Sequence, residues 1–341
     1  MKKFNTHLLL LLLLLASFTL ISCSSDDDGA ELPTDSGISE KIFVAGSVES
    51  SGYLRAVVWN NGNTIYLTDG SKDANAYDVI KDNGKLYVVG FERNSSAVDI
   101  AKYWIDGVSY SLTNGVNDAE ALKIQKHGND IYILVREVLV GYKRTIIFKN
   151  GIEFFTTPSD FSFTPIDFAF KGSDIYILGV DQFGNKSYLK VTNNSFDKFD
   201  LIDFKFATGI KFSGNDRYIY GDKDGSPRYM INNTIQDIED DPSAYSYLYS
   251  MIIESGKIYA TGTTKKDDLQ SQAAVWANNQ VTILTDGLNN AIGFDIDRWQ
   301  NKTYVVGYIG SDLEYMAMLW KDGESFVLAN FGIANSIFID K

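Results

Sequence analysis

The chain has 341 residues, with 31 Lys and Arg side chains against 44 Asp and Glu, for a formal net charge of −13. This acidic balance argues against nucleic acid and anionic lipid headgroups as ligands, because phosphate contacts need clustered Lys and Arg. The single cysteine, Cys23, rules out a disulfide framework within the chain and a thiolate metal site. A chain of this length usually splits into domains unless its fold grows by repetition.

The first 22 residues have the three parts of a secretory signal. Lys2 and Lys3 give a positive start, a leucine run follows over residues 8–15, and Leu-Ile-Ser precedes Cys23. The apolar stretch is shorter than the roughly 20 residues that cross a bilayer. The sequence Leu-Ile-Ser-Cys resembles the lipobox of bacterial lipoproteins. This resemblance implies cleavage before Cys23 and acylation of that cysteine, which would hold the mature chain stably at a membrane.

Residues 23–40 are expected to form a flexible linker. Three aspartates, Asp26, Asp27 and Asp28, follow the cysteine almost at once. An acidic run of this kind is typical of a solvated, self-repelling segment. It also resembles the export signal of Bacteroidota-type lipoproteins, which implies the outer membrane and its exterior face. The folded domain is then expected at residues 41–341.

One sequence motif, an apolar and aromatic strand that ends at or near glycine, recurs seven times in this domain. The copies end at positions 46, 90, 135, 179, 221, 262 and 307, so they are 41 to 45 residues apart. That period matches one four-stranded propeller blade. The repeats resemble β-propeller proteins generally and no named repeat family. We therefore predict an all-β fold, a seven-bladed β-propeller, as a monomeric domain.

A second strand follows each glycine and ends in a tight turn, as at Asn61-Gly62, Asp106-Gly107 and Asp322-Gly323. Both residues of such turns tolerate the positive φ that two-residue hairpins require. Tryptophans occupy matching places before several of these turns, so we expect them to pack between blades. They are Trp59, Trp104, Trp276 and Trp320.

The two ends of the domain complement each other. The first repeat lacks an inner strand before it, while residues 334–340 repeat the inner-strand segment of residues 290–296. We predict that this last strand pairs with residues 42–46 and closes the ring. Closure would remove the open sheet edges that invite aggregation.

The motif Leu-Thr-[Asp/Asn]-Gly-x-x-[Asp/Asn]-Ala occurs three times, and its seventh position is Asp73, Asp118 and Asn290 in turn. We expect these side chains to ring one mouth of the central channel. Asp and Asn in turns commonly accept hydrogen bonds from the turn's own backbone amides, and this is the expected role. The alternative is a set of oxygen ligands for a cation such as Ca²⁺, which prefers six to eight oxygens. No other cofactor is expected.

The longest variable loops follow the glycine strands and are expected to open on the same face as these turns. Loops on a rigid scaffold often carry function, and aromatic rings beside carboxamides suit sugars. Trp299, in an inner hairpin turn, is a further candidate contact, with simple loop packing as the alternative. The aromatic loop candidates are Tyr53, Phe91, Tyr142, Phe183, Tyr308 and Tyr315.

No catalytic constellation stands out. His7 lies in the signal, and a lone turn histidine such as His127 is usually solvated, so imidazole chemistry and His-rich metal sites are not expected. We therefore favour a ligand-binding lipoprotein that captures a glycan or docks an outer-membrane protein. Two alternatives stay open. One is a glycoside hydrolase or lyase that uses carboxylates at the channel mouth, and the other is a structural subunit of an outer-membrane assembly.

Overall fold

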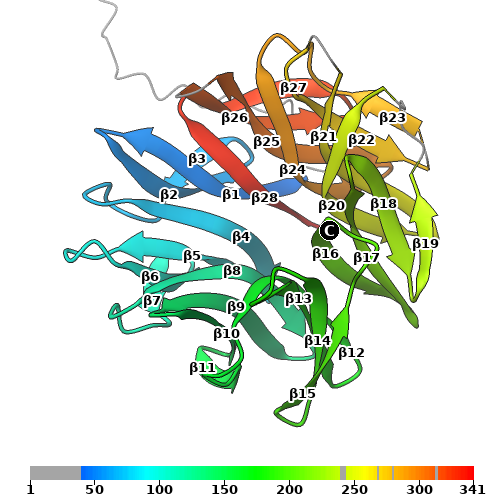
Figure 1. Ribbon diagram of the computed structural model, residues 1–341. Helices are drawn as coiled ribbons and strands as arrows, with labels where there is room; N and C mark the ends of the chain where they lie inside the picture. The colour runs from blue at the N-terminus through cyan, green and yellow to red at the C-terminus, as the bar shows by residue number, and fades with distance from the viewer. Residues whose placement is uncertain (1–39, 239–242, 267–268, 279, 312–313) are drawn as a thin grey trace, which may run out of the picture.

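A computed structural model describes residues 40–238, 243–266, 269–278, 280–311 and 314–341. Within these ranges the chain forms 28 strands in seven four-stranded antiparallel sheets, which stand in a ring (Figure 1). The predicted signal, Cys23 and the predicted linker up to residue 39 lie outside the described residues. In the described part of the chain, no helix is long and apolar enough to cross a membrane.

In each blade the strands follow one another from the channel outward. Blade one consists of β28 (Gly332–Asp340), β1 (Lys41–Ser50), β2 (Tyr53–Asn60) and β3 (Asn63–Tyr66). Blade two consists of β4 (Ala74–Asp82), β5 (Lys85–Arg93), β6 (Asp99–Ile105) and β7 (Val108–Ser111). Blade three consists of β8 (Asp118–His127), β9 (Asp130–Leu139), β10 (Tyr142–Lys149) and β11 (Ile152–Thr156). Blade four consists of β12 (Phe163–Lys171), β13 (Asp174–Asp181), β14 (Lys186–Thr192) and β15 (Ser195–Asp200).

The remaining three blades follow the same plan. Blade five consists of β16 (Phe206–Ser213), β17 (Asp216–Lys223), β18 (Ser226–Ile231) and β19 (Thr234–Asp237). Blade six consists of β20 (Tyr245–Glu254), β21 (Lys257–Lys265), β22 (Gln272–Ala277) and β23 (Gln280–Ile283). Blade seven consists of β24 (Asn290–Trp299), β25 (Lys302–Ser311), β26 (Glu314–Lys321) and β27 (Glu324–Ala329).

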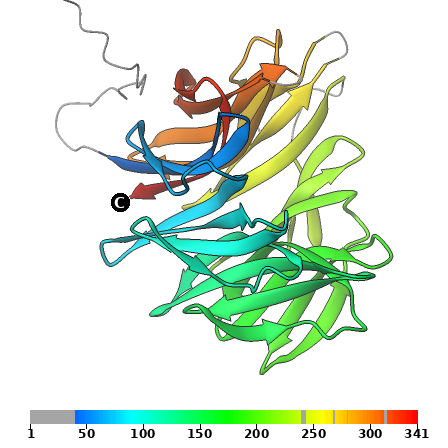
Figure 2. The ribbon, with the colours of Figure 1, turned by 90° about the vertical axis from the view of Figure 1, so that its left-hand side faces the viewer.

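The last strand closes the ring, as the sequence predicts. β28 pairs antiparallel with β1 from Lys41 opposite Asp340 to Val48 opposite Gly332. Both views show blue β1 beside red β28 (Figures 1 and 2). The prediction of a seven-bladed propeller closed by its C-terminal strand is therefore confirmed.

The Asn-Gly and Asp-Gly turns contribute both their backbone conformation and a side-chain bond. Asn61 and Gly62 have φ values of 48° and 84°, the left-handed pair that the sequence predicts. Oδ1 of Asn61 also accepts a hydrogen bond from the Ile42 amide at 2.7 Å. Asp106 accepts the Leu86 amide at 2.9 Å in the same way. The turn residue thus ties the third strand of a blade to the start of the second.

The recurrent glycine is explained by a β-bulge in each innermost strand. Gly90 pairs with Ala76, the residue before the bulged Tyr77. A Cβ on Gly90 would lie 1.9 Å from the carbonyl oxygen of Asn75. A Cβ on Gly307 would lie 1.8 Å from the carbonyl oxygen of Ile292. The bulge brings the two backbones close, and glycine is the residue that allows this approach. The bulged residues are Tyr77, Leu122, Ile166, Thr208, Tyr249, Phe294 and Asn335.

Three aspartates just after the bulges connect neighbouring blades around the channel. Asp78 accepts the Val79 amide of its own blade at 3.0 Å and the Ile124 amide of the next blade at 2.9 Å. The same two-blade arrangement recurs at Asp167 and Asp295. Each carboxylate therefore satisfies two backbone donors of innermost strands, which pair with another strand on one side only.

Lys123 is the basic member of this ring. Burial alone would lower its pKa, but the charges of Asp78, Asp295 and Asp167 outweigh burial and raise the pKa above the usual value for lysine. Lys123 therefore carries a positive charge between the three carboxylates. This charge offsets part of the repulsion between the buried Asp78 and Asp167 and the half-buried Asp295.

The core lies between the blades. Trp104 is fully buried in a cluster with Phe43 and Val58 of blade one and Val88 of its own blade. Trp59, Trp276 and Trp320 are each at most 1% exposed and belong to equivalent clusters. The predicted role of these tryptophans in packing between blades is confirmed.

Candidate functional site

The two faces of the ring differ in their exposed apolar side chains. The face formed by the connections from the second to the third strand of each blade, and from one blade to the next, is called the loop face. The opposite face, formed by the tight hairpin turns, is called the turn face. Of the described residues, ten large apolar side chains that are more than a third exposed lie in the loop-face connections or at the strand ends beside them: Tyr53, Val116, Val140, Phe183, Ile202, Phe206, Tyr245, Leu269, Leu288 and Phe331.

Among the described residues, the turn face has fewer such side chains, namely Val108 and Ile152, each at the strand end directly after a hairpin turn. No exposed large apolar side chain lies in a hairpin turn of the turn face, as far as the structure describes these turns. The other exposed ones lie on the outermost strands β3, β7, β11, β15 and β23, apart from Val138 near the loop-face end of β9. Exposed apolar surface is typical of interaction sites when it gathers on one face. The loop face is therefore the candidate functional surface.

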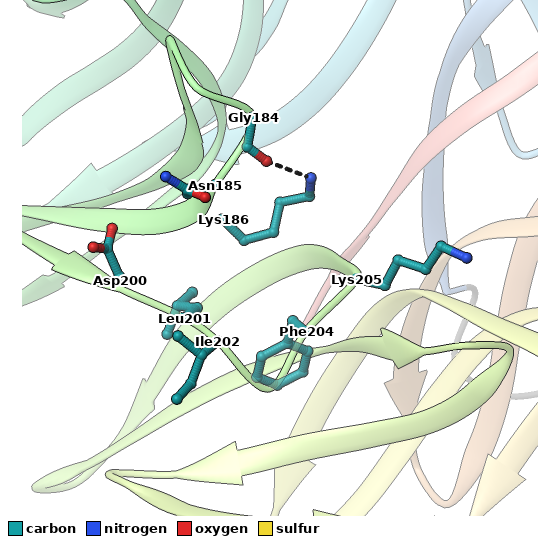
Figure 3. A pocket seen from close by; sticks show the side chains of 8 residues that line it. All are labelled: Gly184, Asn185, Lys186, Asp200, Leu201, Ile202, Phe204 and Lys205. Atoms are coloured by element: carbon teal, nitrogen blue, oxygen red, sulfur yellow. Dashed lines mark hydrogen bonds between the residues drawn. The ribbon is translucent and has the colours of Figure 1, made fainter.

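The largest of three adjoining cavities on this face lies between blades four and five. It has a volume of about 490 Å³ (Figure 3). On one side is the segment of Gly184, Asn185 and Lys186, and on the other are Leu201, Ile202 and Phe204 (Figure 3). The Lys186 ammonium donates to the Gly184 carbonyl at 3.1 Å, while Ile202 is 87% exposed. The cavity thus combines polar and apolar walls.

Asp181 holds the loop that borders this cavity. Its Oδ1 accepts the amides of Phe183 and Asn185, both at 2.9 Å, and its Oδ2 contacts the Lys198 ammonium at 2.5 Å. Burial would raise the pKa of Asp181, but these hydrogen bonds outweigh it and lower the pKa to about 2. The carboxylate is therefore charged at neutral pH and fixes the loop that presents Phe183, which is 78% exposed.

A second cavity, of about 290 Å³, lies between blades five and six at the channel mouth. Its walls are Phe206 and Thr208 of β16, Asp222 of β17, and residues 247–249 of β20. Tyr247 also lines a third cavity of about 330 Å³, beside the connection from β21 to β22. The segment of residues 200–205 lines the first cavity, residues 206 and 208 line the second, and Tyr247 lines both the second and the third, so the three cavities lie next to one another across blades four to six.

An aromatic series continues from the second cavity into blade seven. The ring centroids of Tyr249 and Phe294 are 5.5 Å apart, those of Phe294 and Tyr308 5.7 Å, and those of Tyr308 and Tyr315 4.7 Å. Burial raises the pKa of Tyr249 and of Tyr308, so both phenols stay neutral and able to donate. The structure therefore brings two predicted residues, Tyr308 and Tyr315, together with two that the sequence analysis did not single out.

The other predicted aromatic residues are dispersed. Tyr53 and Phe183 are exposed on the loop face, but they belong to blades one and four, while Tyr142 of blade three is partly buried. Phe91 differs from the prediction of a loop contact, because it lies within β5, is 8% exposed and packs 5.9 Å from the Tyr77 ring. Trp299 lies on the turn face and packs against a hydrophobic cluster, which matches the loop-packing alternative.

The hydrogen bonds of the Leu-Thr-[Asp/Asn]-Gly-x-x-[Asp/Asn]-Ala motif also differ in detail from those expected. The turn's own amides are accepted by its third residue, as at Asp69 and Asn114. Asp73, Asp118 and Asn290 reach the preceding blade instead, where they accept the amides of Leu54, Asp99 and Ser271. Among the described residues, no group of three or more His, Cys, Asp or Glu side chains is placed to hold a metal ion. The calcium alternative stays a prediction that the observed hydrogen bonds do not support.

His127 differs from the expected solvated histidine. Its ring stacks on Phe170 of the next blade with centroids 4.2 Å apart and an interplanar angle of 5°. Tyr132 lies at its edge, with centroids 6.4 Å apart. The histidine therefore contributes to packing between blades three and four on the turn face.

Asp222 is the site residue that the sequence analysis missed. It directly follows the recurrent Gly221, at a place where other repeats have Ser47, Phe91, Thr263 or Tyr308. An acidic side chain at a mostly uncharged repeat position was the available signal. What the sequence could not show is that Asp222 faces the aromatic residues of β16 and β20, which come from two different blades.

Comparison with known proteins supports the architecture alone. No family model and no curated protein matches the chain. Its structure is similar to a Mycobacterium tuberculosis puromycin-hydrolyzing peptidase, with a TM-score of 0.57 and 10% identity over 84% of this chain and 53% of that chain. The similarity to a puromycin hydrolase has a TM-score of 0.59 and 9% identity, over 86% of this chain and 52% of that chain. This chain thus spans about half the length of these two proteins.

A third similar structure is the β-propeller domain of the Trilobed protease from Pyrococcus furiosus, which has an open velcro topology. The TM-score is 0.51 at 13% identity, over 82% of this chain and 87% of that domain. At such identities the likeness defines a class of fold and no activity. The class is the seven-bladed β-propeller, and here the ring is closed by pairing of β28 with β1.

Proposed function

We propose that this chain is a lipid-anchored protein of the outer cell surface whose propeller binds a glycan or a partner protein on its loop face. The observation that carries the proposal is the gathering of exposed apolar side chains and of three adjoining cavities on that face. Such concave, partly apolar sites with a few polar groups are typical of ligand binding.

A binding role is favoured over catalysis by the way the channel carboxylates are used. Asp78, Asp167 and Asp295 each accept two backbone amides, so they are bound as structural acceptors. Asp222 is the only acidic side chain among the described residues that line the second cavity. Glycoside hydrolysis uses a pair of carboxyl groups across the scissile bond. A release assay for reducing sugar on a polysaccharide panel tests the enzymatic alternative, and we expect no release.

The proposed anchor follows from the sequence around Cys23. The expected result is that the wild-type chain incorporates a labelled fatty acid and sediments with membranes. The Cys23→Ala variant should lose the label and leave the membrane fraction. Retention of that variant in the membrane fraction would contradict the lipid anchor, and protease accessibility on intact cells would test the exterior location.

A glycan array tests the binding proposal directly. The probe is the chain without residues 1–23, which keeps every residue of the closed ring. Phe183→Ala and Tyr53→Ala remove exposed rings on blades four and one of the loop face, while Phe154→Ala removes a ring that is 42% exposed on the outermost strand β11. We expect a specific glycan signal that falls in at least one loop-face variant and persists in the Phe154 control.

An array without a hit would shift the proposal to a protein partner. Cross-linking on intact cells would then be carried out with the same variants. A partner captured by wild type and by Phe154→Ala, but lost from a loop-face variant, would support docking through this face. Equal capture by all variants would refute the loop face as the binding surface.

A further inference from the structure

Asp222 is a buried carboxylate with one unpaired oxygen. The residue is 1% exposed, and its Oδ1 accepts the Gly225 amide at a long 3.3 Å. Its Oδ2 has no hydrogen-bond partner among the residues that the structure describes. Buried polar atoms in proteins are almost always hydrogen-bonded, so such an atom needs an explanation. The contrast with Asp78, whose two oxygens both accept amides, is direct.

The surroundings of Asp222 suit an organic cation. The second cavity places this carboxylate beside aromatic residues of β16 and β20. Phe206 is 47% exposed at the rim, where the Lys186 ammonium already lies 5.7 Å from its ring centroid, and the Phe206 ring lies 6.4 Å from that of Tyr247 at an interplanar angle of 73°. Tyr247 and Tyr249 supply further aromatic rings that attract a cation, and the carboxylate accepts its hydrogen bonds. A cavity of about 290 Å³ has room for the carbon skeleton of a small amine.

Charged groups on the neighbouring segments do not neutralise Asp222 directly. Lys205, just before β16, contacts Asp224 at 3.6 Å, and Arg228 of β18 pairs with Asp237 at 2.9 Å. Asp224, on the same turn as Asp222, adds negative charge, and Tyr249 of β20 is kept neutral by burial. The carboxylate therefore keeps the capacity to bind a positive group.

We infer that this cavity binds a protonated amine, with Asp222 accepting its hydrogen bond and the aromatic rings packing against the skeleton that carries it. The inference rests on the proposed function, because it names the ligand chemistry for one part of the same loop face. An anionic ligand would be repelled by Asp222, and a purely apolar one would leave Oδ2 unpaired.

Phenethylamine is the probe for the first experiment, and 2-phenylethanol is its neutral counterpart of nearly equal shape. Ligand-observed NMR with the chain lacking residues 1–23 should detect phenethylamine binding, with the alcohol at least about tenfold weaker. Asp222→Asn should weaken phenethylamine by about tenfold or more and leave the alcohol unchanged. Asp224→Asn, whose side chain is 74% exposed on the same turn, is the matched control: it removes one nearby negative charge and should weaken phenethylamine much less than Asp222→Asn does.

The pH dependence gives a second readout. Burial of Asp222 raises its pKa to about 6. Phenethylamine affinity should therefore be flat from about pH 7 to about pH 9, where the amine keeps its proton. It should fall as the pH drops below 6, because protonation removes the acceptor charge. Equal binding of amine and alcohol, or a pH-independent affinity that Asp222→Asn does not change, would overturn the inference. Tyr247→Ala gives a further check, since loss of the aromatic wall should weaken the amine without altering this pH profile.

Two larger probes separate the sources of the amine. Chitosan oligomers carry free amines on a glycan and their N-acetylated counterparts carry neutral amides instead, while lysine-rich peptides carry the amine on a polypeptide. Preference for either amine-bearing probe, lost in Asp222→Asn, supports the inference. A glycan hit on the array that is insensitive to charge and to Asp222 would sustain the proposed function while refuting the amine site.

Discussion

Replacing Asp222 with asparagine tests whether this carboxylate is held unfavourably in the folded protein. The substitution preserves shape and keeps an oxygen that can accept the Gly225 amide. It removes the ability to ionise and replaces the second carboxylate oxygen with an NH2 donor. A carboxylate placed for ligand binding should reduce stability, because the native state then buries a charge without satisfying it.

The size of the effect follows from the pKa. Burial raises the pKa of Asp222 from 3.8 to about 6, so between these pH values the folded state binds more protons than the unfolded state. Wild-type stability therefore falls as the pH rises through this window, and the loss is complete above it. The free-energy change amounts to about 3 kcal/mol, because each pH unit between the two pKa values corresponds to roughly 1.4 kcal/mol.

The assay is urea unfolding of wild type and Asp222→Asn at pH 4 and pH 8. We expect Asp222→Asn to be more stable at pH 8 by up to about 3 kcal/mol, with most of that difference gone at pH 4. The difference between the two proteins isolates Asp222, because all other titrating groups are common to both. Asp160→Asn, which changes an exposed carboxylate in the connection from β11 to β12, serves as the control and should not reproduce the gain in stability at pH 8.

A stability difference that is the same at pH 4 and pH 8 would refute the reasoning. So would an Asp222→Asn variant less stable than wild type at pH 8. Either result would show that the folded protein satisfies the charge of Asp222, and the amine site would then lose its physical basis.

Three further changes test the architecture by urea unfolding. Asp78→Ala should lower the free energy of unfolding by at least about 2 kcal/mol, because it leaves the buried amides of Val79 and Ile124 without an acceptor. Asp160→Ala, at an exposed position, is the control. An equal loss of stability in both variants would contradict the role of Asp78 in connecting two blades. Gly90→Ala should lower the free energy of unfolding by about 1–3 kcal/mol, because the added Cβ would lie 1.9 Å from a backbone oxygen. Gly84→Ala, at a position with open space around it, isolates the effect of positive φ. A smaller loss of stability in Gly90→Ala than in Gly84→Ala would disprove the close-approach explanation. Deletion of residues 333–341 removes most of β28 and should lower the melting temperature or prevent folding, whereas a deletion that melts like the full domain would show that ring closure is dispensable.

The sequence by itself determined the number of blades, their turns and the closing strand. These features are local or periodic: Asn61-Gly62 specifies a hairpin within a few residues, and the copies of the glycine strand recur at a nearly constant interval. The matching segments at residues 290–296 and 334–340 were enough to predict that β28 belongs to blade one.

Only the tertiary structure decided which side chains meet at the loop face and which are consumed by the ring. Asp78 and Asp222 are both acidic residues in or beside inner strands, yet one accepts two amides and the other keeps an unpaired oxygen. The difference depends on partners such as Ile124, 46 residues from Asp78, and on the aromatic residues of β16 and β20 around Asp222. Contacts between neighbouring blades depend on bulge geometry and on packing across repeats, which strand periodicity does not encode.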